Sequence, residues 1–318
     1  MPTVSVIIAT HSRPHLLPRA IESARKAGTD VEVIVVDDAS TDETAEVCRN
    51  LKDIKYVRAE RNQRVAGARN LGILVSSAEY ISFLDDDDVR LPGTLDIQVN
   101  TLDRFPEIGL VYGQVINGDQ NCLPTSQPPW PSPCPQGDIF WLLLETDFIP
   151  CLSAVFRKSC LMRVGLLNAT IPGVDDWDLW VRIAEIYPIL AIEQPVAIWR
   201  VPTPESGQGS SSPMELTLSV SSQFRECWLN LPRAVNVSKE QKRDIWNRFI
   251  NRVADGLVFE AADEMNRRKY ISGCKKILLS LRLNPSRAFR PRALRFLLGR
   301  AYKLSVESIA SLLTSMLV

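Results

Sequence analysis

The sequence predicts an α/β fold, with a mostly parallel sheet flanked by helices and followed by a helical C-terminal region. Two apolar runs, Val4–Thr10 and Val31–Val36, have the composition of buried strands. An amphipathic helical stretch separates them, with apolar residues at Leu16, Leu17, Ala20, Ile21 and Ala24. This alternation is typical of βαβ units in a parallel sheet. Beyond residue 210 the pattern is helical, with few strand signals.

The first helix is expected to begin at Ser12, an N-cap residue followed by Pro14 in the first turn. Ser40–Glu43 has the pattern of a capping box that opens the next helix. The pair Asp37 and Asp38 ends the second strand, where open α/β sheets bind ligands. Such a pair accepts hydrogen bonds from a ribose or a base; the alternative is charge compensation at the helix N-terminus. Glycine-rich dinucleotide and Walker sequences are missing from the chain.

The most informative stretch is an apolar run, Tyr80–Leu84, that leads directly into four carboxylates, Asp85–Asp88. The first part has the character of a buried strand, but four adjacent anions cannot be buried unpaired. A strand that ends in carboxylates places them at the ligand edge of the sheet. Oxygen ligands suit Mg²⁺ or Mn²⁺, which are often shared with substrate phosphates. The alternative is a solvated acidic turn.

The rest of the first 205 residues alternates short strands with helices. Residues 124–135 hold six prolines and are expected to form a loop that exposes Trp130. Asp175–Arg182 has the pattern of a helix with Asp175 and Asp176 at its N-terminus, where an ionised carboxylate is favoured. Asp176 is therefore a candidate general base, with helix capping as the alternative. Further strands are expected at 56–58, 108–112, 149–156 and 197–200, and further helices from 67, over 97–105 and over 138–144.

Charge is distributed unevenly along the 318 residues, although the net charge is zero. Residues 1–232 hold 19 Lys and Arg against 30 Asp and Glu, whereas residues 233–318 hold 18 against 7. This basic tail includes a segment with Arg287, Arg290 and Arg292. We expect it to contact a membrane surface, to fold on the acidic first part, or to form a homodimer. Nucleic acid is not an expected partner, because no recognised nucleic-acid-binding module is present.

Cysteine and histidine usage favours a reduced, cytoplasmic protein, with peripheral contact at the inner membrane surface as an option for the tail. The seven cysteines are scattered, odd in number and without a Cys-x-x-Cys pair. The two histidines are too few for a zinc site. We expect neither a signal peptide nor a membrane-spanning run of about 18 apolar residues. Residues 202–213 are rich in Pro, Ser and Gly, which predicts a mobile loop.

Four segments, taken together and in order, resemble the family 2 nucleotide-sugar glycosyltransferases. They are Val4–Arg13, Val35–Asp42, Gly67–Gly72 with Asp85–Asp88, and Asp175–Arg182. The resemblance implies a GT-A fold with a Rossmann-like sheet over residues 1–205. A linker over 206–232 and a basic helical region over 233–318 complete the expected organisation.

The resemblance also implies roles for individual residues. Asp87 matches the metal ligand of the family's Asp-x-Asp motif, and Asp176 matches the base of its Glu-Asp-Trp motif, which here reads Asp175-Asp176-Trp177. Pro202 stands where the family often has His, which argues against a side-chain contact with the metal or the diphosphate from this loop. The residues implied to bind the nucleotide sugar are Ala9, Thr10, Arg13, Asp38, Arg69, Asp85 and Asp86.

The implied function is an inverting glycosyltransferase that uses Mg²⁺ or Mn²⁺. Its donor would be a nucleoside-diphosphate sugar, and its acceptor a hydroxyl of a polysaccharide, lipid-linked or other glycan. One alternative is a nucleotidyltransferase, although Thr10–Pro14 lacks the glycines of the usual phosphate loop. The other is a non-catalytic protein that binds nucleotide sugars, against which the intact Asp85, Asp87 and Asp176 argue.

Overall fold

The structure is a computed structural model, and it describes residues 2–171, 173–203, 206 and 212–288. The described residues form two compact units, one within residues 2–206 together with 231–233 and one of residues 212–230 with 234–288. The strands are β1 Val4–Thr10, β2 Val31–Asp37, β3 Lys55–Arg58, β4 Tyr80–Asp85, β5 Val89–Arg90, β6 Leu110–Gly118, β7 Val155–Arg157 and β8 Ile189–Arg200. The helices up to residue 186 are α1 Leu17–Lys26, α2 Thr44–Asn50, α3 Arg64–Val75, α4 Thr94–Arg104, α5 Phe140–Glu145, η1 Cys151–Ser153, η2 Lys158–Cys160, α6 Leu161–Val164 and α7 Asp175–Ile186.

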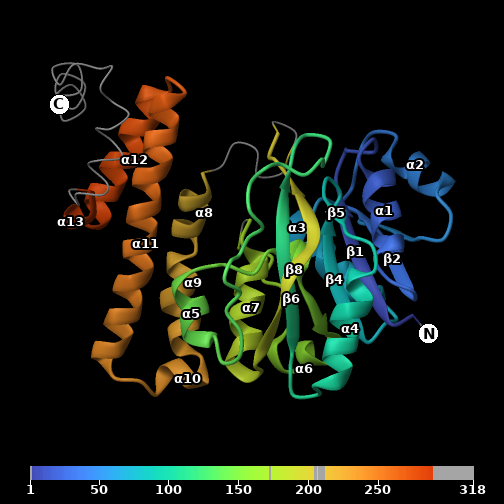
Figure 1. Cartoon of the computed structure of the whole chain (residues 1–318), viewed down its shortest axis with the longest axis horizontal. Coiled ribbons are helices and arrows are strands. Elements are labelled where there is room, and N and C mark those ends of the chain that lie inside the picture. Colours follow the sequence, from blue (N-terminus) through green and yellow to red (C-terminus); the bar gives the residue numbers. More distant parts are fainter. Residues whose placement is uncertain (1, 172, 204–205, 207–211, 289–318) are drawn as a thin grey trace. The chain divides into compact units, whose positions relative to one another are not determined.

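The first unit is built on one sheet with the strand order β3-β2-β1-β4-β7-β6-β8-β5, which runs through the part of Figure 1 coloured blue to yellow. Strands β1 to β4 are parallel, as predicted. β7 is antiparallel to both β4 and β6, whereas β6 and β8 are parallel. The predicted α/β fold is confirmed, with a parallel first half and a mixed second half. Since β2 and β4 flank β1 on opposite sides, the sheet opens a crevice at the carboxyl end of β1.

Helices cover both faces of this sheet. Successive side chains of a strand point to opposite faces, so a strand of continuous apolar residues presents apolar groups on both. Val4, Val6 and Ile8 of β1 belong to a buried apolar cluster with residues of α1 and α4. On the opposite face, α3 lies against β1 and β2. α7 packs there as well: the Trp180 ring lies 5.6 Å from Phe156 of β7. These packed faces fix the strand ends that carry the acidic residues.

Three predicted details differ from the structure. α1 begins only at Leu17, and Ser12 lies in a left-handed backbone conformation with a φ of 53°, so Ser12 is not its N-cap. α2 has no capping box: Asp42 instead accepts hydrogen bonds from the Thr44 amide and hydroxyl. Much of the strand predicted over 149–156 is the 3₁₀ turn η1, with only the short β7 after it.

The second unit is helical, as predicted for the C-terminal region. Ser238 and Gln241 form a capping box at the start of α11, and the buried Lys276 of α12 pairs with Glu260 and Glu264 of α11. The segment predicted to be a linker, 206–232, contains helices α8 and α9. The helices after residue 210 are α8 Pro213–Ser219, α9 Ser221–Glu226, η3 Trp228–Asn230, α10 Pro232–Val235, α11 Lys239–Asn266, α12 Tyr270–Leu283 and α13 Pro285–Ala288.

Two expectations fall mostly outside the described residues. They are the mobile loop over 202–213 and the arginine-rich segment beyond residue 288. The membrane, dimer and localisation hypotheses that depend on the tail stay predictions. Within the described residues, we find no helix that is both long and apolar enough to cross a membrane. All seven cysteines are described, and each is free.

Gly72 allows α3 to approach the sheet closely. A Cβ at this position would overlap Cγ2 of Ile7 and would lie 3.2 Å from Cγ2 of Val36, and both side chains are fully buried. We expect Gly72→Ala to lower the free energy of unfolding by about 1–3 kcal/mol, because the helix must move away from the strands. Leu74→Ala on the same helix shortens a side chain that is 68% exposed, and it should change the free energy of unfolding by less than about 0.5 kcal/mol. Urea denaturation measures both, and equal stability of the two variants would contradict the close packing.

Candidate active site

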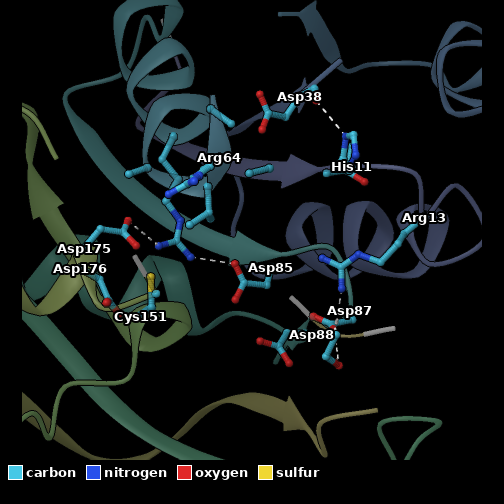
Figure 2. Close-up of a pocket in the computed structure, with 18 of the residues that line it drawn as sticks. His11, Arg13, Asp38, Arg64, Asp85, Asp87, Asp88, Cys151, Asp175 and Asp176 are labelled. Carbon is cyan, nitrogen blue, oxygen red and sulfur yellow. Dashed lines mark hydrogen bonds and ion pairs between the residues drawn. The ribbon is translucent and has the colours of Figure 1, made fainter. Parts of the chain in front are cut away.

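A pocket of the first unit lies at the carboxyl ends of β1 and β4. It has a volume of about 500 Å³, a size that suits a small-molecule ligand. Figure 2 shows Asp85, Asp87 and Asp88 at this edge, with Asp38 on one side and Asp175 and Asp176 on another. Residues from well-separated parts of the chain meet here because parallel strands end at one edge. The lining side chains include Thr10, Arg13, Asp38, Arg64, Arg69, Asp85, Asp87, Asp88, Cys151, Asp175, Asp176, Trp199, Arg200 and Ser206.

The two acids at the end of β2 occupy different environments. Asp37 is fully buried, and it accepts hydrogen bonds from the Ser40 amide at 2.8 Å and the Tyr56 hydroxyl at 2.7 Å. Asp38 lines the pocket and accepts a hydrogen bond from the Gln63 amide at 2.7 Å. Burial raises the pKa of Asp38. Asp37 therefore holds the loop together, while Asp38 is the acid that a ligand can reach.

The acidic run divides between the pocket and the interior. Asp85 and Asp87 line the pocket, whereas Asp86 is fully buried and is not among the lining residues. Asp86 accepts a hydrogen bond from the Thr10 hydroxyl at 2.6 Å and pairs with Arg13 at 2.6 Å. Burial raises the pKa of Asp86 to about 7, against the lowering effect of Arg13. The predicted direct contact of Asp86 with a nucleotide sugar does not fit this placement, because its carboxylate is used to hold Thr10 and Arg13.

Asp87 lies beside two arginines and a serine of the pocket. Its Oδ2 lies 3.3 Å from Nη1 of Arg13 and 3.6 Å from Nη1 of Arg200. The Ser206 hydroxyl donates to the same oxygen at 3.2 Å. Arg200 is itself nearly buried, and its Nε donates to the Gln120 carbonyl at 2.8 Å. Two guanidinium groups and one acid thus meet at one point of the pocket. Guanidinium groups can bind phosphate oxygens, and a carboxylate can bind a metal ion.

Asp88, the last acid of the run, is also nearly buried. It accepts a hydrogen bond from the backbone amide of Arg200 at 2.7 Å. Burial and the neighbouring Asp85 and Asp87 raise its pKa well above the usual value. Asp88 therefore ties the end of β8 to the acidic run and holds Arg200 at the pocket.

Arg69 connects the two acidic groups of the pocket. Its guanidinium is nearly buried and lies 2.7 Å from Asp85 and 3.2 Å from Asp175. It also lies over the Phe83 ring, 5.2 Å from the centroid. Asp85 ends β4 and Asp175 begins α7, so one cation on α3 fixes a strand end and a helix start relative to each other.

Asp176 lies beside this pair, at the N-terminal end of α7. Burial, followed by the neighbouring Asp175, raises its pKa to about 6, while Arg69 acts in the opposite direction. A carboxylate with this pKa is ionised near neutral pH and accepts a proton more readily than an ordinary aspartate does. Asp176 therefore has the properties of a general base that faces a ligand pocket.

The carboxylate oxygens of the pocket suit a hard divalent cation. Asp85 and Asp87 offer carboxylate oxygens, which Mg²⁺ and Mn²⁺ prefer. Such ions are commonly held by one or two carboxylates, with further ligands from substrate phosphates. In the described part of the chain, no three or more His, Cys, Asp or Glu side chains are grouped to hold a metal by themselves. The residues therefore fit a cation that is shared with a bound diphosphate.

Most residues singled out from the sequence meet in this pocket. Ala9, Thr10, Arg13, Asp38, Arg69, Asp85, Asp87 and Asp176 all line it. Sequence reasoning assigned no role to Asp88, Arg64, Cys151 or Ser206. The only signal for Asp88 was its place in the acidic run, and the other three had none. Pro202 also lines the pocket.

Residues 5–164 match the family described as Glycosyl transferase family 2. The chain belongs to Glycosyl transferase family 2. The matched region runs from the second residue of β1 through β4 and the acidic run, but it ends before Asp176.

Curated relatives agree with this membership. A protein of Rickettsia felis named "Uncharacterized glycosyltransferase" is 30% identical over 195 residues, covering 59% of this chain and 32% of that protein. The glucosyltransferase WfaP of Escherichia coli, named for transfer from UDP-Glc to α-D-GlcNAc-diphosphoundecaprenol, is 28% identical over 189 residues, covering 58% of this chain and 70% of WfaP. The chain spans a third or less of the length of several curated relatives that it matches.

Solved structures with the same fold include Staphylococcus aureus TarS. Residues 1–349 of TarS in complex with UDP-GlcNAc superpose with a TM-score of 0.61 at 17% identity. The superposition covers 88% of this chain and 79% of that one. At this identity the likeness concerns the fold alone, and it confirms the predicted GT-A fold of this family 2 protein.

The Arg69 bridge gives a stability prediction. Arg69→Met leaves Asp175 buried without its cation, so we expect the free energy of unfolding to fall by about 3 kcal/mol at pH 8. The pKa of Asp175 is already raised by burial, and loss of Arg69 raises it further. The folded variant then binds a proton more readily than the unfolded chain, so the loss should shrink as the pH falls to 5.

Chemical denaturation at the two pH values measures this effect. Lys26→Met is the matched control, because Lys26 makes an exposed helical ion pair with Glu22 at 3.1 Å. Its loss should cost less than about 0.5 kcal/mol at either pH. If Arg69→Met behaved like this control, the bridge would not support the structure.

Proposed function

We propose that the chain is an inverting, metal-dependent glycosyltransferase. It transfers a sugar from a nucleoside-diphosphate sugar to a hydroxyl acceptor. The observation that carries the proposal is that Asp87, a carboxylate suited to a metal-bound diphosphate, and Asp176, a carboxylate with the pKa of a base, line one pocket. An inverting displacement needs one base and no covalent nucleophile, and this pocket supplies such a base.

The donor is held along the carboxyl edge of the sheet. Asp38 accepts hydrogen bonds from the base, and Asp85 accepts them from the ribose. Arg13 and Arg200 turn from Asp87 towards the diphosphate oxygens, since guanidinium groups bind phosphate with charge-assisted hydrogen bonds. Arg69 keeps Asp85 and the start of α7 in place during this exchange.

The transfer step depends on Asp176. Its carboxylate takes the proton of the acceptor hydroxyl while that oxygen attacks the anomeric carbon. The bond from this carbon to the diphosphate oxygen breaks, and the nucleoside diphosphate leaves from the opposite face. A divalent cation, when bound with Asp87, supplies charge stabilisation for the leaving diphosphate.

The acceptor is proposed from the chemistry of relatives. WfaP carries a lipid-linked sugar acceptor in its name, and UDP-GlcNAc is bound to the TarS structure. We infer a glycan or lipid-linked saccharide acceptor and a nucleoside-diphosphate hexose or hexosamine donor. Hydrolysis of a panel of nucleotide sugars with Mn²⁺ tests the donor, and transfer from the donor that is hydrolysed to saccharides tests the acceptor. A nucleotidyltransferase would instead release pyrophosphate from nucleoside triphosphates, and a binding protein would release neither product.

The metal role of Asp87 has a binding test. Asp87→Asn removes one charge from the proposed cation site, so Mn²⁺ should no longer strengthen nucleoside-diphosphate binding. We expect an affinity loss of about 10-fold or more in Mn²⁺ and little loss in EDTA. Isothermal titration measures both affinities. Asp53→Asn, at an exposed loop position, is the matched control and should bind like the wild type. Mn²⁺-dependent binding that survives in Asp87→Asn would refute the metal role.

The base role of Asp176 has a kinetic test. Asp176→Asn should keep the donor affinity and lose about 10²–10⁴-fold in turnover, because only the transition state needs the proton acceptor. In the wild type, kcat/KM should fall below a pH of about 6, where Asp176 becomes protonated. A collapse of donor affinity in the variant would show that Asp176 acts as a ligand or a structural residue instead.

A further inference from the structure

Exposed apolar side chains gather beside the pocket mouth. Among the described residues, eleven large apolar side chains are exposed, and four of these lie around the carboxyl end of β6. They are Leu123, Trp130, Trp199 and Val201, which we call the apolar rim. Exposed single apolar residues are ordinary on protein surfaces, but a cluster beside a pocket marks a contact surface.

Strand register places the two tryptophans of the rim on one face of the sheet. Trp130 pairs with Val115 of β6, and Trp199 of β8 pairs with Asn117. Paired residues share a face, and so do Val115 and Asn117, which are two positions apart. Since β8 and the Trp130 segment flank β6 on opposite sides, ordinary strand spacings place the two Cα atoms about 12 Å apart. A single pyranose ring does not span that separation.

The Trp130 side of the rim is held by the sheet. Trp130 and Val115 exchange backbone hydrogen bonds of 2.7 and 3.0 Å. The side chain of Gln114 donates to the Pro131 carbonyl at 3.0 Å, and the Tyr112 hydroxyl donates to the Pro135 carbonyl at 2.6 Å. The indole is therefore presented on a fixed backbone, so that a ligand does not have to order it on binding.

The rim is continuous with the active pocket. Trp199 is 40% exposed and also lines the pocket that contains Asp176. The next residue, Arg200, reaches Asp87 in the same pocket. A molecule that lies along the rim and enters the pocket at Trp199 would bring one end to the proposed base. That is the arrangement required of an acceptor.

The residue composition around the rim indicates which class of ligand it can bind. Residues 115–131 and 196–203 contain only two charged side chains, Asp119 and Arg200, and Arg200 is nearly buried. The other polar side chains are amides and hydroxyls of Asn, Gln, Ser and Thr. An anionic membrane surface or a phosphate-rich polymer would require exposed Lys or Arg. Aromatic faces next to neutral hydrogen-bonding groups match sugar rings, which present C–H faces and hydroxyl edges.

We propose that the acceptor is a neutral saccharide chain of at least two sugar units, bound along the apolar rim by stacking on Trp130 and Trp199. The proposal rests on the proposed function and extends it to the acceptor. Trp199 receives the sugar that presents its hydroxyl to Asp176, and Trp130 holds a sugar further along the chain. Acceptor length thus becomes a determinant of affinity.

The test uses the full chain and an array of neutral and anionic oligosaccharides of one to six units. We expect binding to neutral members of two or more units. Trp130→Ala should weaken that binding by about 10-fold, Trp130→Phe should retain most of it, and Trp130→Leu should weaken it because Leu has no flat face. Leu74→Ala, which alters an exposed apolar residue away from the rim, should bind like the wild type.

Parallel measurements separate this proposal from the proposed function. Nucleoside-diphosphate affinity with Mn²⁺ reports the donor site: its absence in the wild type would refute the function itself. With donor binding intact, failure to bind any neutral oligosaccharide would overturn the rim proposal. Full retention of binding in Trp130→Leu would overturn it as well. Sedimentation with phosphatidylglycerol vesicles that is lost in Trp130→Ala would show a membrane contact instead, and would also overturn it.

Discussion

The site depends on one buried cation, Arg69, held between Asp85 and Asp175. Without Arg69, the neighbouring carboxylates would raise the free energy of the folded protein, because like charges repel strongly in a partly desolvated pocket. The guanidinium offsets that repulsion and, through its planar fork, sets the distance between the end of β4 and the start of α7. The geometry of Asp176 follows, since it is the next residue along α7.

A similar arrangement recurs at the other end of the acidic run. Asp86 lies outside the pocket lining and holds Thr10 and Arg13, whereas Asp85, Asp87 and Asp88 line the pocket. Asp88 is nearly buried and also accepts a hydrogen bond from the backbone amide of Arg200. Four consecutive carboxylates are tolerated because each has a partner that offsets its charge or its burial. Asp86 and Asp88 hold Arg13 and Arg200, and these two arginines pair with Asp87.

The sequence predicted the elements whose signal is local and the residues whose chemistry is distinctive. Buried strands such as β1 and β2 show a continuous apolar run. Because the strands are parallel, the acids that follow β2 and β4 could be placed at one edge of the sheet. Ser12 failed as a helix cap because the chain turns through a left-handed conformation there before α1 begins. Asp86 looked the same as Asp85 and Asp87 in the sequence, since only the turn after β4 decides which carboxylates face inward. Arg200 and Ser206 reach Asp87 through long-range packing, which no local pattern encodes.

The pairing of Asp87 with Arg13 and Arg200 bears on how a charged product would depart. Because Asp87 pairs with both arginines, release of a nucleoside diphosphate would leave none of these three groups with an uncompensated charge. If Arg13 and Arg200 bind the diphosphate as proposed, they exchange one anionic partner for another. The free energy of the pocket with and without the diphosphate then differs less than it would with unpaired groups. Such a pocket binds the nucleoside diphosphate less tightly and therefore releases it more easily as a product.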